Sequence, residues 1–520
     1  MPYESFGNRR NSVQFGVGRS VWVGTRPTVI PERVLDMIPG GLAWIALGLV
    51  VLGAYYIPLA LVFGAALLAF YSAVRFSFAG VANLIGLRHV RRWEAIDWRA
   101  EYARRATPDS LPLAAVHHVV IIPNYKEDLS TLRRTLHHLA AQARGAGSMS
   151  IVLAMEVGEA GALEKGALLE AEFGACFKNF LVATHPKGIS GEMQCKSANQ
   201  AWAARWVRRV LVDEQGCDLD HLIVTTMDSD TVWHPHYFES LAVLFATDPQ
   251  RHTTFWQAPI RYHGNVWSIN PLMRILHAYS SAWELAYLAA PWWQALPMSS
   301  YSMSLRLLDS VGYWDPDVIA DEWHMYIKSY FQRQGDVRLQ PIFLPFWANA
   351  TTGETIPKAI KERYLQTLRH AWGAKEIGYT IAQMSENPQT SFGGAFNLLF
   401  RVAHDNLLAG VGWVVMMLGS QLPMLFHPSL VRESMQTAPF ILLQVSLTLV
   451  SALTIIFWVL DLRIRPPRSQ PWTRRERLYE LASLPLLAVM TLICVALPVL
   501  HSQTRLMLGV PLQFRVAAKR

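Results

Sequence analysis

The hydrophobic pattern separates an apolar N-terminal part from a mixed middle and an apolar C-terminal third. No charged residue occurs from Met37 to Val74. A helix needs about 20 apolar residues to span a bilayer, so this run predicts a transmembrane helical hairpin over 37–88 that turns near Tyr55–Pro58. Basic residues on both flanks of the hairpin predict that both flanks are cytoplasmic. The apolar run begins too late and is too long for a cleavable signal peptide.

Three further apolar runs, at 407–426, 438–460 and 481–500, predict transmembrane helices within 406–502. The loop DLRIRPPRSQPWTRRER between the last two runs is strongly basic and is therefore expected in the cytoplasm. Three crossings would leave the basic tail 503–520 outside, so either the count is wrong by one or the tail tolerates that side. The mixed segment 390–410 is expected to form an interfacial helix ahead of these spans.

Short β-rich runs alternate with helical stretches between about 113 and 345. HHVVIIPNY, SMSIVLAMEVG and HLIVTTMD have the pattern of buried strands, and EDLSTLRRTLHHLAAQA and KSANQAWAARWVRRVLV that of helices. This alternation predicts an α/β domain over 113–345 with a largely parallel sheet. Ligands of such sheets bind beyond the carboxyl ends of the strands. We therefore expect Pro123–Glu127, Glu156 and Asp228–Asp230, which follow three strands, to face one crevice.

Asp228 and Asp230 stand one residue apart just after a predicted strand. In an extended chain, side chains at i and i+2 point the same way, so the two carboxylates repel each other unless a cation lies nearby. Mg²⁺ and Mn²⁺ prefer oxygen ligands, and Mg²⁺ usually combines one or two protein carboxylates with substrate phosphates. The pair therefore suggests a metal site that binds a nucleotide diphosphate; a structural turn is the alternative.

Composition supports a membrane protein. Hydrophobic residues make up 52% of the 520-residue chain and charged residues 17%, whereas soluble domains carry about 25% charged residues. The net charge of +8 fits basic cytoplasmic loops, and no zinc-finger spacing or other nucleic-acid motif accompanies it. The four cysteines form no CxxC pair, which argues against a disulfide framework and a zinc site.

The order of the motifs IIPNYKED, MDSD, VIADEWH and QTLRHAW resembles the membrane-bound family-2 glycosyltransferases, which include cellulose, chitin and hyaluronan synthases and ceramide glucosyltransferase. The resemblance covers about 116–373 and the flanking membrane helices. It implies a Rossmann-like GT-A domain on the cytoplasmic face, inserted between N-terminal and C-terminal transmembrane helices. It also implies a nucleotide-sugar donor and inversion at the anomeric carbon.

On the donor side, the resemblance assigns residues at strand ends and at one helix start. The expected donor-binding residues are Pro123, Asn124, Tyr125, Glu127, Glu156, Lys196, Asn199 and Asp228. Glu156 stands where the family usually has aspartates, which leaves the nucleobase contact at this position open. Asp228 and Asp230 match the metal-binding DxD motif.

On the acceptor side, GYWDPDVIADEWHM matches the segment that carries the family's TED motif, with the acidic pair in reversed order. Glu322 is the expected general base by position, and Asp321 is the alternative. QTLRHAW matches QxxRW through Gln366, Arg369 and a displaced Trp372, within a segment 346–405 that also holds interfacial helices. Metal and cations would stabilise the leaving diphosphate, and the carboxylate would take the proton of the attacking hydroxyl.

These patterns together predict a multi-pass, metal-dependent inverting glycosyltransferase of a bacterial inner membrane. It is expected to transfer a sugar from a nucleotide-diphospho-sugar, such as a UDP-sugar, to a polysaccharide or lipid acceptor at the cytoplasmic face, with no nucleic-acid partner. Segment 1–36 is expected in the cytoplasm. The alternatives are a non-catalytic nucleotide-sugar sensor, which the reversed Asp321–Glu322 keeps open, and a transporter with a cytoplasmic regulatory domain. The near absence of ionisable residues from the predicted spans disfavours the transporter.

Overall fold

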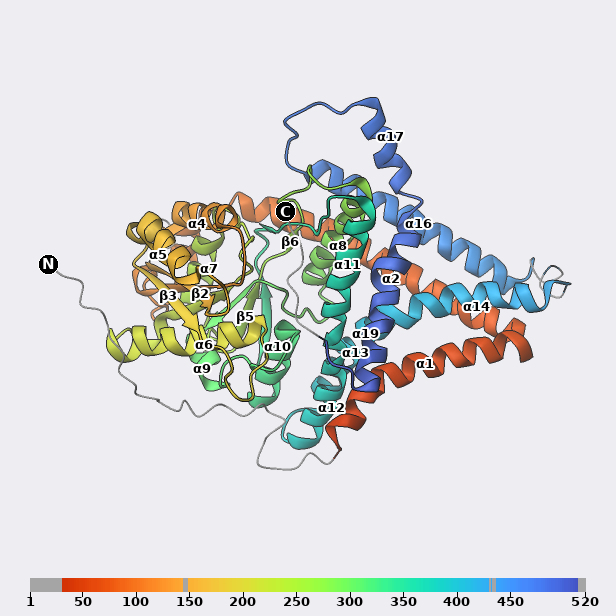
Figure 1. Ribbon diagram of the computed structural model, residues 1–520, viewed down its shortest axis with the longest axis horizontal. Helices are drawn as coiled ribbons and strands as arrows, with labels where there is room; N and C mark the ends of the chain where they lie inside the picture. Colours follow the sequence, from red (N-terminus) through yellow and green to blue (C-terminus); the bar gives the residue numbers. More distant parts are fainter. Residues whose placement is uncertain (1–29, 144–147, 430–431, 433–435, 513–520) are drawn as a thin grey trace.

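The computed structural model describes residues 30–143, 148–429, 432 and 436–512. Residues 1–29 of the predicted cytoplasmic segment 1–36 and residues 513–520 of the tail 503–520 lie outside the described residues. An α/β domain occupies one end of the molecule and a bundle of long apolar helices the other (Figure 1). The domain lies between the first two and the last apolar helices in the sequence, so apolar helices flank it at both ends, as predicted.

A seven-stranded sheet with the order β3-β2-β1-β4-β7-β5-β8 forms the α/β domain. The strands are β1 (His117–Asn124), β2 (Ser148–Glu156), β3 (Asn179–His185), β4 (Leu222–Thr226), β5 (Thr254–Gln257), β7 (Tyr301–Ser304) and β8 (Arg338–Pro341). Strand β7 runs antiparallel to both β4 and β5, and the other pairs are parallel. Strands β6 (Ile260–Arg261) and β9 (Phe346–Trp347) form a second, two-stranded sheet. The predicted α/β class is confirmed, with a mixed sheet that is parallel except at β7.

Helices cover both faces of the sheet, which explains why the middle of the interior strand β1 is apolar on both faces. Residues 119–122 of β1 are fully buried, and they point alternately to the two faces. Val120 and Ile122 pack with α4 (Leu129–Ala143) and α7 (Tyr237–Thr247), whereas Val119 and Ile121 pack with α6 (Lys196–Arg208). The two layers of helices leave the carboxyl-terminal ends of the strands uncovered.

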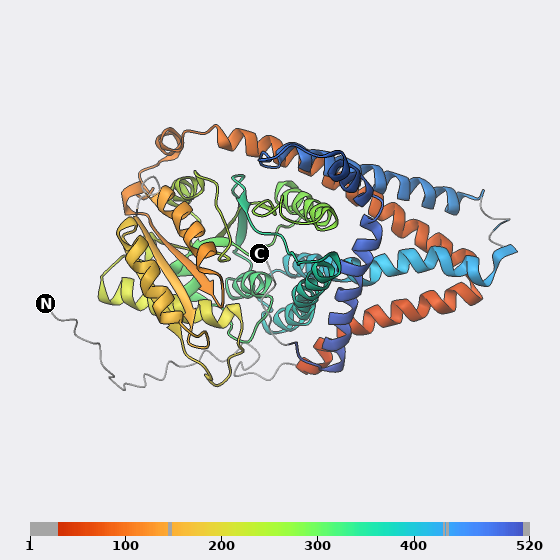
Figure 2. The same ribbon diagram turned by 45° about the horizontal axis from the view of Figure 1, so that its top comes forward.

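Within the described ranges, five helical segments are long and apolar enough to cross a membrane. They are α1 (Glu32–Tyr56), α2 (Pro58–Glu94), the segment from α13 (Phe392–Leu407) through α14 (Trp413–Phe426), α16 (Ala438–Ile464), and the segment from α18 (Leu487–Thr491) through α19 (Leu497–Leu508). Figures 1 and 2 show α1, α14 and the distal parts of α2 and α16 extending away from the sheet, whereas α19 runs crosswise to these helices. The segment 390–410 forms α13 and joins α14 through a π-helical turn.

Helix α19 is fastened in this crosswise position by hydrogen bonds to α1. The Arg33 guanidinium donates to the Leu506 carbonyl at 2.8 Å, and the Trp44 indole donates to the Thr504 hydroxyl at 2.9 Å. The other side of α19 packs against α11 (Ile356–His370). Helix α19 therefore lies between the apolar bundle and the helix that carries the QTLRHAW motif.

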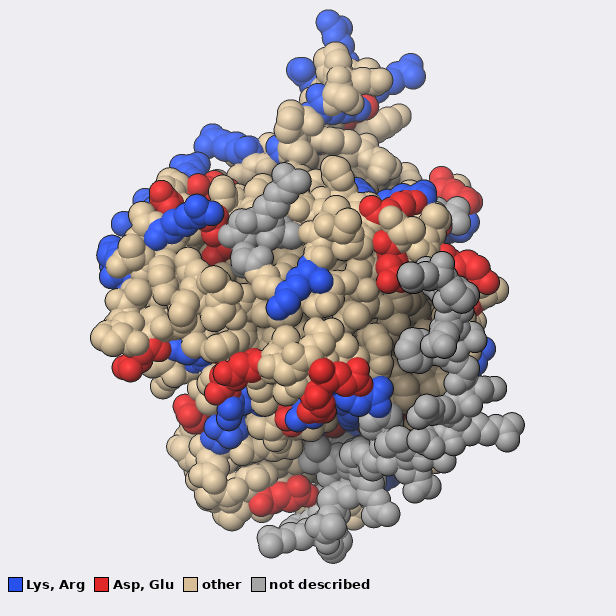
Figure 3. Space-filling model, turned by 90° about the vertical axis from the view of Figure 1, so that its left-hand side faces the viewer, with Lys and Arg blue, Asp and Glu red and all other residues tan. Residues whose placement is uncertain are grey.

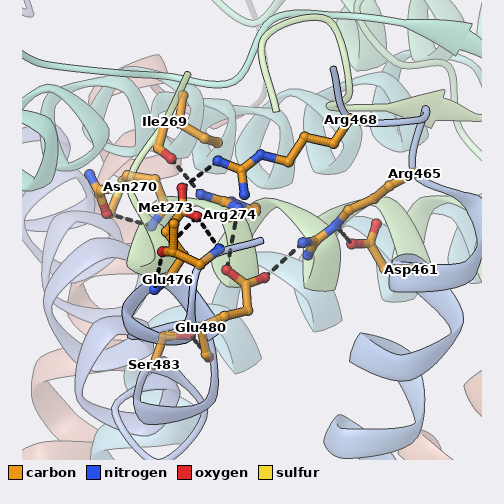
Figure 4. Close-up of polar contacts among 11 residues, drawn as sticks. Ile269, Asn270, Met273, Arg274, Asp461, Arg465, Arg468, Glu476, Glu480 and Ser483 are labelled. Carbon is orange, nitrogen blue, oxygen red and sulfur yellow. Dashed lines mark hydrogen bonds and ion pairs between the residues drawn. The ribbon is translucent and has the colours of Figure 1, made fainter. Parts of the chain in front are cut away.

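A buried ion-pair network ties α8 (Pro271–Ala289) to α16 and to α17 (Arg474–Ser483) (Figure 4). Arg465 donates to Asp461 at 2.5 Å and to Glu480 at 2.7 Å, and Arg274 of α8 lies 3.4 Å from Glu480. The Arg465 and Glu480 side chains are only 1% and 5% exposed. Separating these buried charges would leave them unpaired, which is strongly destabilising. The network therefore holds the start of α8 against the apolar bundle.

Candidate active site

A cavity of about 540 Å³ opens at the carboxyl ends of β1, β2 and β4. Helices α8, α10 (Asp321–Gln332) and α11 close its other side. Among the residues predicted from sequence, those that line it are Pro123, Asn124, Tyr125, Glu127, Glu156, Lys196, Asn199, Asp228, Asp230, Asp321, Glu322, Gln366 and Arg369. The residues that follow β1, β2 and β4 meet because these parallel strands end on the same edge of the sheet, and α10 and α11 bring Asp321, Glu322, Gln366 and Arg369 to the same hollow.

The turn after β1 shapes the first wall of the cavity. Glu159 accepts a hydrogen bond of 3.3 Å from the Asn124 amide side chain and one of 2.6 Å from the Lys126 backbone N–H. Lys126 has a φ of 59°, a left-handed conformation that turns the chain sharply. This turn presents Pro123, Tyr125 and Glu127 to the cavity.

Glu156, at the end of β2, is held by a neighbouring histidine. The two ring nitrogens of His185 lie 3.1 Å from a Glu156 carboxylate oxygen and 2.8 Å from a Glu192 carboxylate oxygen. Burial lowers the pKa of His185, but the two carboxylates outweigh it and raise the pKa to about 9, so the ring donates to both. The acidic group at this strand end is therefore already paired within the chain.

Asp228 and Asp230 point to different partners. Strand β4 ends at Thr226, and the Thr231 N–H donates to the Asp228 carbonyl at 3.0 Å, so the chain turns where an extended conformation would have aligned the two side chains. Asp228 receives a hydrogen bond of 2.8 Å from the Lys196 ammonium group. The Asp230 carboxylate, which is 3% exposed as a residue, accepts from the Asn349 backbone N–H at 3.0 Å.

Lys196, at the start of α6, is the cation at the centre of this acidic group. Its ammonium nitrogen lies 3.7 Å from Glu322 and also donates to the Ser299 carbonyl at 3.0 Å. Burial alone would lower the pKa of Lys196, but the carboxylates of Asp228, Asp321 and Glu322 together raise it. Lys196 is therefore charged and neutralises part of the negative charge at the open edge of the sheet.

Asp321 and Glu322 begin α10 with different surroundings. The Asp321 residue is 4% exposed, and its carboxylate accepts a hydrogen bond from the Gln200 amide of α6. The Glu322 side chain is 24% exposed and faces the cavity. Burial and the neighbouring Asp321 charge raise the pKa of Glu322 to about 7. Glu322 is thus the accessible carboxyl of the pair, with a pKa suited to taking up a proton near neutral pH.

A second network beneath α10 fixes the position of this pair. His324 bonds to Asp315 at 2.8 Å and to Glu376 at 2.9 Å through its two ring nitrogens. Burial opposes the charge on His324, but the two carboxylates raise its pKa to about 10. Lys328 donates to the other oxygen of Asp315 at 2.6 Å, so a closed set of charges locks α10 against α12 (Lys375–Glu386).

The QTLRHAW motif lies on α11 and just past its end. Gln366 and Arg369, three residues apart, share the helix face that lines the cavity. Trp372 follows the helix, within a 3₁₀ turn, and is half-buried; it is not among the lining residues, whereas His370 and Gly373 are. Burial lowers the pKa of Arg369, against the opposing effect of Asp228, Glu322 and Asp321. Its guanidinium lies within electrostatic reach of these three carboxylates and contributes positive charge to the same part of the cavity.

The oxygen donors of the cavity fit a divalent cation that shares its ligands with a substrate. In the described part of the chain, no three His, Cys, Asp or Glu side chains are grouped so that they could hold a metal ion by themselves. Mg²⁺ usually takes only one or two protein carboxylates and completes its shell with substrate phosphates. Asp228, with Asp230 or Glu322, meets that requirement in the presence of a diphosphate.

Tyr262, Glu284 and Asn406 are among the lining residues that belong to no motif singled out in the sequence analysis. Glu284 lies within α8 and Asn406 within α13, helices whose sequences show only an amphipathic or apolar pattern. No local sequence signal distinguishes these residues, because their places in the cavity depend on how the two helices pack against the α/β domain.

Comparison with known proteins identifies related sequences and folds. Residues 223–461 match the family described as "Glycosyl transferase family group 2", and residues 117–281 match "Glycosyltransferase like family 2". No protein of curated function matches the chain significantly.

Two solved structures are similar to the chain at low sequence identity. The mannosyltransferase PcManGT from Pyrobaculum calidifontis, solved in complex with GDP-Man and Mn²⁺, is 14% identical over 82% of this chain and 99% of its own, with a TM-score of 0.39. TarS from S. aureus is 12% identical over 60% of this chain and 50% of its own, with a TM-score of 0.29. At these TM-scores the two likenesses carry no argument of their own.

Proposed function

We propose that this protein, in which residues 223–461 and 117–281 match two family-2 glycosyltransferase families, is an integral membrane, inverting glycosyltransferase that uses a nucleotide-diphospho-sugar such as a UDP-sugar. The family and the GT-A type of the sheet, both expected from the order of the motifs, are confirmed. One observation carries the proposal: the acidic strand ends, two cations and an accessible carboxyl group line the same cavity.

The donor is proposed to lie along the strand ends. Pro123 and Tyr125 would face its nucleoside, and Lys196 and Arg369 would contact its diphosphate from two sides. Their positive charges stabilise the negative charge that develops on the leaving nucleoside diphosphate. Asp228 and Asp230 would hold Mg²⁺ or Mn²⁺, which supplies further positive charge to the diphosphate oxygens.

Glu322 is proposed as the general base. An acceptor hydroxyl oxygen forms a bond to the anomeric carbon while the bond from that carbon to the diphosphate breaks, and Glu322 takes the hydroxyl proton. Asp321 is less suited to this role because its carboxylate is buried against Gln200. A single displacement of this kind, without a covalent sugar–enzyme intermediate, inverts the anomeric configuration.

The arrangement of the helices supports a bilayer crossed four times, by α1, α2, α14 and α16 (Figure 1). Helix α19 would then lie along the membrane surface, and the tail that follows would remain on the side of the α/β domain. With two C-terminal crossings the basic tail lies in the cytoplasm, whereas three crossings would place it outside. A protease-cleavable tag at the C-terminus is expected to be accessible from the same side as the domain.

Helix α17 supports the same placement of the membrane surface. Basic side chains gather on this projecting helix (Figure 3), where Arg474, Arg475 and Arg477 are exposed. Leu478 and Tyr479 are 64% and 62% exposed on the same short helix. Arginines beside exposed apolar side chains are typical of helices that lie in the interface of an anionic bilayer.

Release of nucleoside diphosphate tests the proposal. Purified protein in detergent is incubated with a panel of UDP- and GDP-sugars, with Mn²⁺, with Mg²⁺ or with EDTA. We expect release from at least one donor, dependent on the metal and lost in Glu322→Gln. Donor binding without release would contradict the enzymatic function and favour a nucleotide-sugar sensor, and absence of both would contradict any nucleotide-sugar site.

A further inference from the structure

Glu284 places a carboxyl group in the cavity at a position that none of the motifs explains. Its neighbour Tyr262, which also lines the cavity, donates a hydrogen bond of 3.3 Å to one Glu284 oxygen. The second oxygen, Oε2, is buried and has no hydrogen-bond partner. A buried polar atom without a partner costs free energy, so its retention at the wall of a cavity points to a partner supplied by a ligand.

The position of Glu284 is set by the apolar bundle. The adjacent α8 residues Ala282, Trp283 and Ala286 pack in one cluster with Phe76 of α2 and Phe457 of α16. The first turn of α8 is fixed by the pairing of Arg274 with Glu480 (Figure 4). Glu284 therefore faces the cavity from the side of the apolar helices, opposite the strand ends.

Asn406 lines the same cavity from a helical segment that is itself apolar enough to cross a membrane. The cavity thus extends from the edge of the sheet, where the motif residues lie, to helices of the bundle. Since the donor is assigned to the strand ends, the space beside Glu284 and Asn406 remains for the acceptor.

The charges differ between the two sides of the cavity. Lys196 and Arg369 suit a diphosphate on the donor side. Burial raises the pKa of Glu284 to about 8, and the opposing effects of the Tyr262 hydrogen bond and of Arg363 do not reverse this shift. Glu284 therefore carries its proton at neutral pH and offers both a donor and an acceptor to an uncharged hydroxyl. A phosphate group placed there would face the Glu284 carboxyl group, and like charges would oppose the ionisation of both.

We propose that Glu284 and Tyr262 bind a hydroxyl group of the acceptor, and that the acceptor presents an uncharged, hydroxyl-bearing head group such as a sugar, in contrast to a lipid phosphate. This inference rests on the proposed glycosyltransferase function and specifies its acceptor class. Glu284 acts by hydrogen bonding and takes no part in the proton transfer assigned to Glu322.

Two acceptor probes with the same tail and different head groups test the inference: dodecyl glucoside and dodecyl phosphate. The donor is the nucleotide sugar that the release assay identifies. Wild-type protein is expected to glycosylate dodecyl glucoside and not dodecyl phosphate. Transfer to dodecyl phosphate, or to neither probe, overturns the inference.

Variants of the two residues separate acceptor binding from donor binding. Glu284→Ala is expected to raise KM for dodecyl glucoside about tenfold or more, because one buried hydrogen-bonding group is lost, while KM for the donor changes little. Glu284→Gln keeps an uncharged hydrogen-bonding group and should remain close to wild type. Tyr262→Phe should raise KM for dodecyl glucoside by a smaller factor. Glu354→Ala is the matched control, since the Glu354 side chain is 77% exposed.

The outcomes also separate this inference from the proposed function. Release of nucleoside diphosphate with water as acceptor is followed in the same samples. If wild-type protein releases none, the glycosyltransferase function itself is contradicted. If wild-type protein releases it and Glu284→Ala leaves KM for dodecyl glucoside unchanged, or raises KM for the donor instead, only the role of Glu284 is overturned.

Discussion

The ammonium nitrogen of Lys196 lies 2.8 Å from a carboxylate oxygen of Asp228, joining the start of α6 to the end of β4. The same nitrogen lies 3.7 Å from Glu322, so one cation connects the expected metal-binding and proton-accepting groups. The negative charge at the edge of the sheet is thus partly balanced by the chain itself. A diphosphate that enters with a divalent cation would meet the positive charge of Lys196, and its cation would meet the negative charge of Asp228.

Loss of the Lys196 charge is expected to weaken donor binding. Lys196→Gln should raise KM for the nucleotide sugar about tenfold or more, because a charge-assisted contact to the diphosphate is removed. Lys196→Arg should retain part of the affinity. Initial rates of nucleoside diphosphate release measure the effect, with the exposed Lys178→Gln as control. An unchanged KM in Lys196→Gln would remove Lys196 from the donor site.

The two aspartates after β4 are expected to differ in their metal and stability effects. Asp228→Asn should raise the Mn²⁺ concentration for half-maximal activity about tenfold or more, since a neutral amide is a poorer ligand for a hard cation. Asp230→Asn should in addition lower Tm, because Asp230 is buried against the Asn349 N–H. A Mn²⁺ titration and thermal unfolding distinguish the two, with the exposed Asp336→Asn as control. Identical metal curves in all three variants would contradict the proposed metal site.

Replacement of the proposed base is expected to slow the chemical step. Glu322→Gln should lower kcat about 100-fold or more, the range of general-base catalysis, while donor binding persists. Asp321→Asn should alter kcat less, and it should lower Tm because the buried Asp321–Gln200 contact changes. Steady-state rates and donor titrations provide both quantities. A larger kcat loss in Asp321→Asn than in Glu322→Gln would assign the base to Asp321.

The pKa of Glu322 predicts the acid side of the pH profile. Burial and the nearby Asp321 charge raise this pKa to about 7, and the base acts only when it is ionised. The value of kcat/KM should therefore fall as the pH decreases through about 7 and approach a plateau above it. Rates measured over this range in buffers of constant ionic strength test the expectation. A profile that is flat down to the ordinary carboxyl range would show that Glu322 titrates normally or is not the base.

The ion pair between Arg465 and Glu480 is expected to stabilise the joint between α8 and the apolar bundle. Glu480→Gln removes the carboxylate that Arg274 and Arg465 share, so that Arg465 retains only Asp461; breaking a buried ion pair typically costs about 3–5 kcal/mol. Thermal unfolding in detergent should show a lower Tm. Glu476→Gln is the matched control on the same helix, because the Glu476 side chain is 38% exposed. Equal shifts in the two variants would contradict the structural role of the buried pair.

The sequence by itself identified the strands, the motif residues at their ends and the apolar segments. Those features follow from local patterns: apolar runs of strand length predict where β1, β2 and β4 end, and parallel strands present their ends at one edge. The position of Lys196 between Asp228 and Glu322, by contrast, depends on how α6 and α10 pack against the sheet. No spacing along the chain encodes that distance.

Tertiary structure alone decided the direction of α19 and the place of Glu284. An apolar segment has a similar composition whatever its direction, so the crosswise direction of α19 follows only from its packing against α1 and α11. Glu284 is one acidic residue in an otherwise amphipathic helix, and its exposure to the cavity results from the contacts of α8 with α2 and α16. Local periodicity determines which residues form an element, whereas long-range packing determines which of them meet.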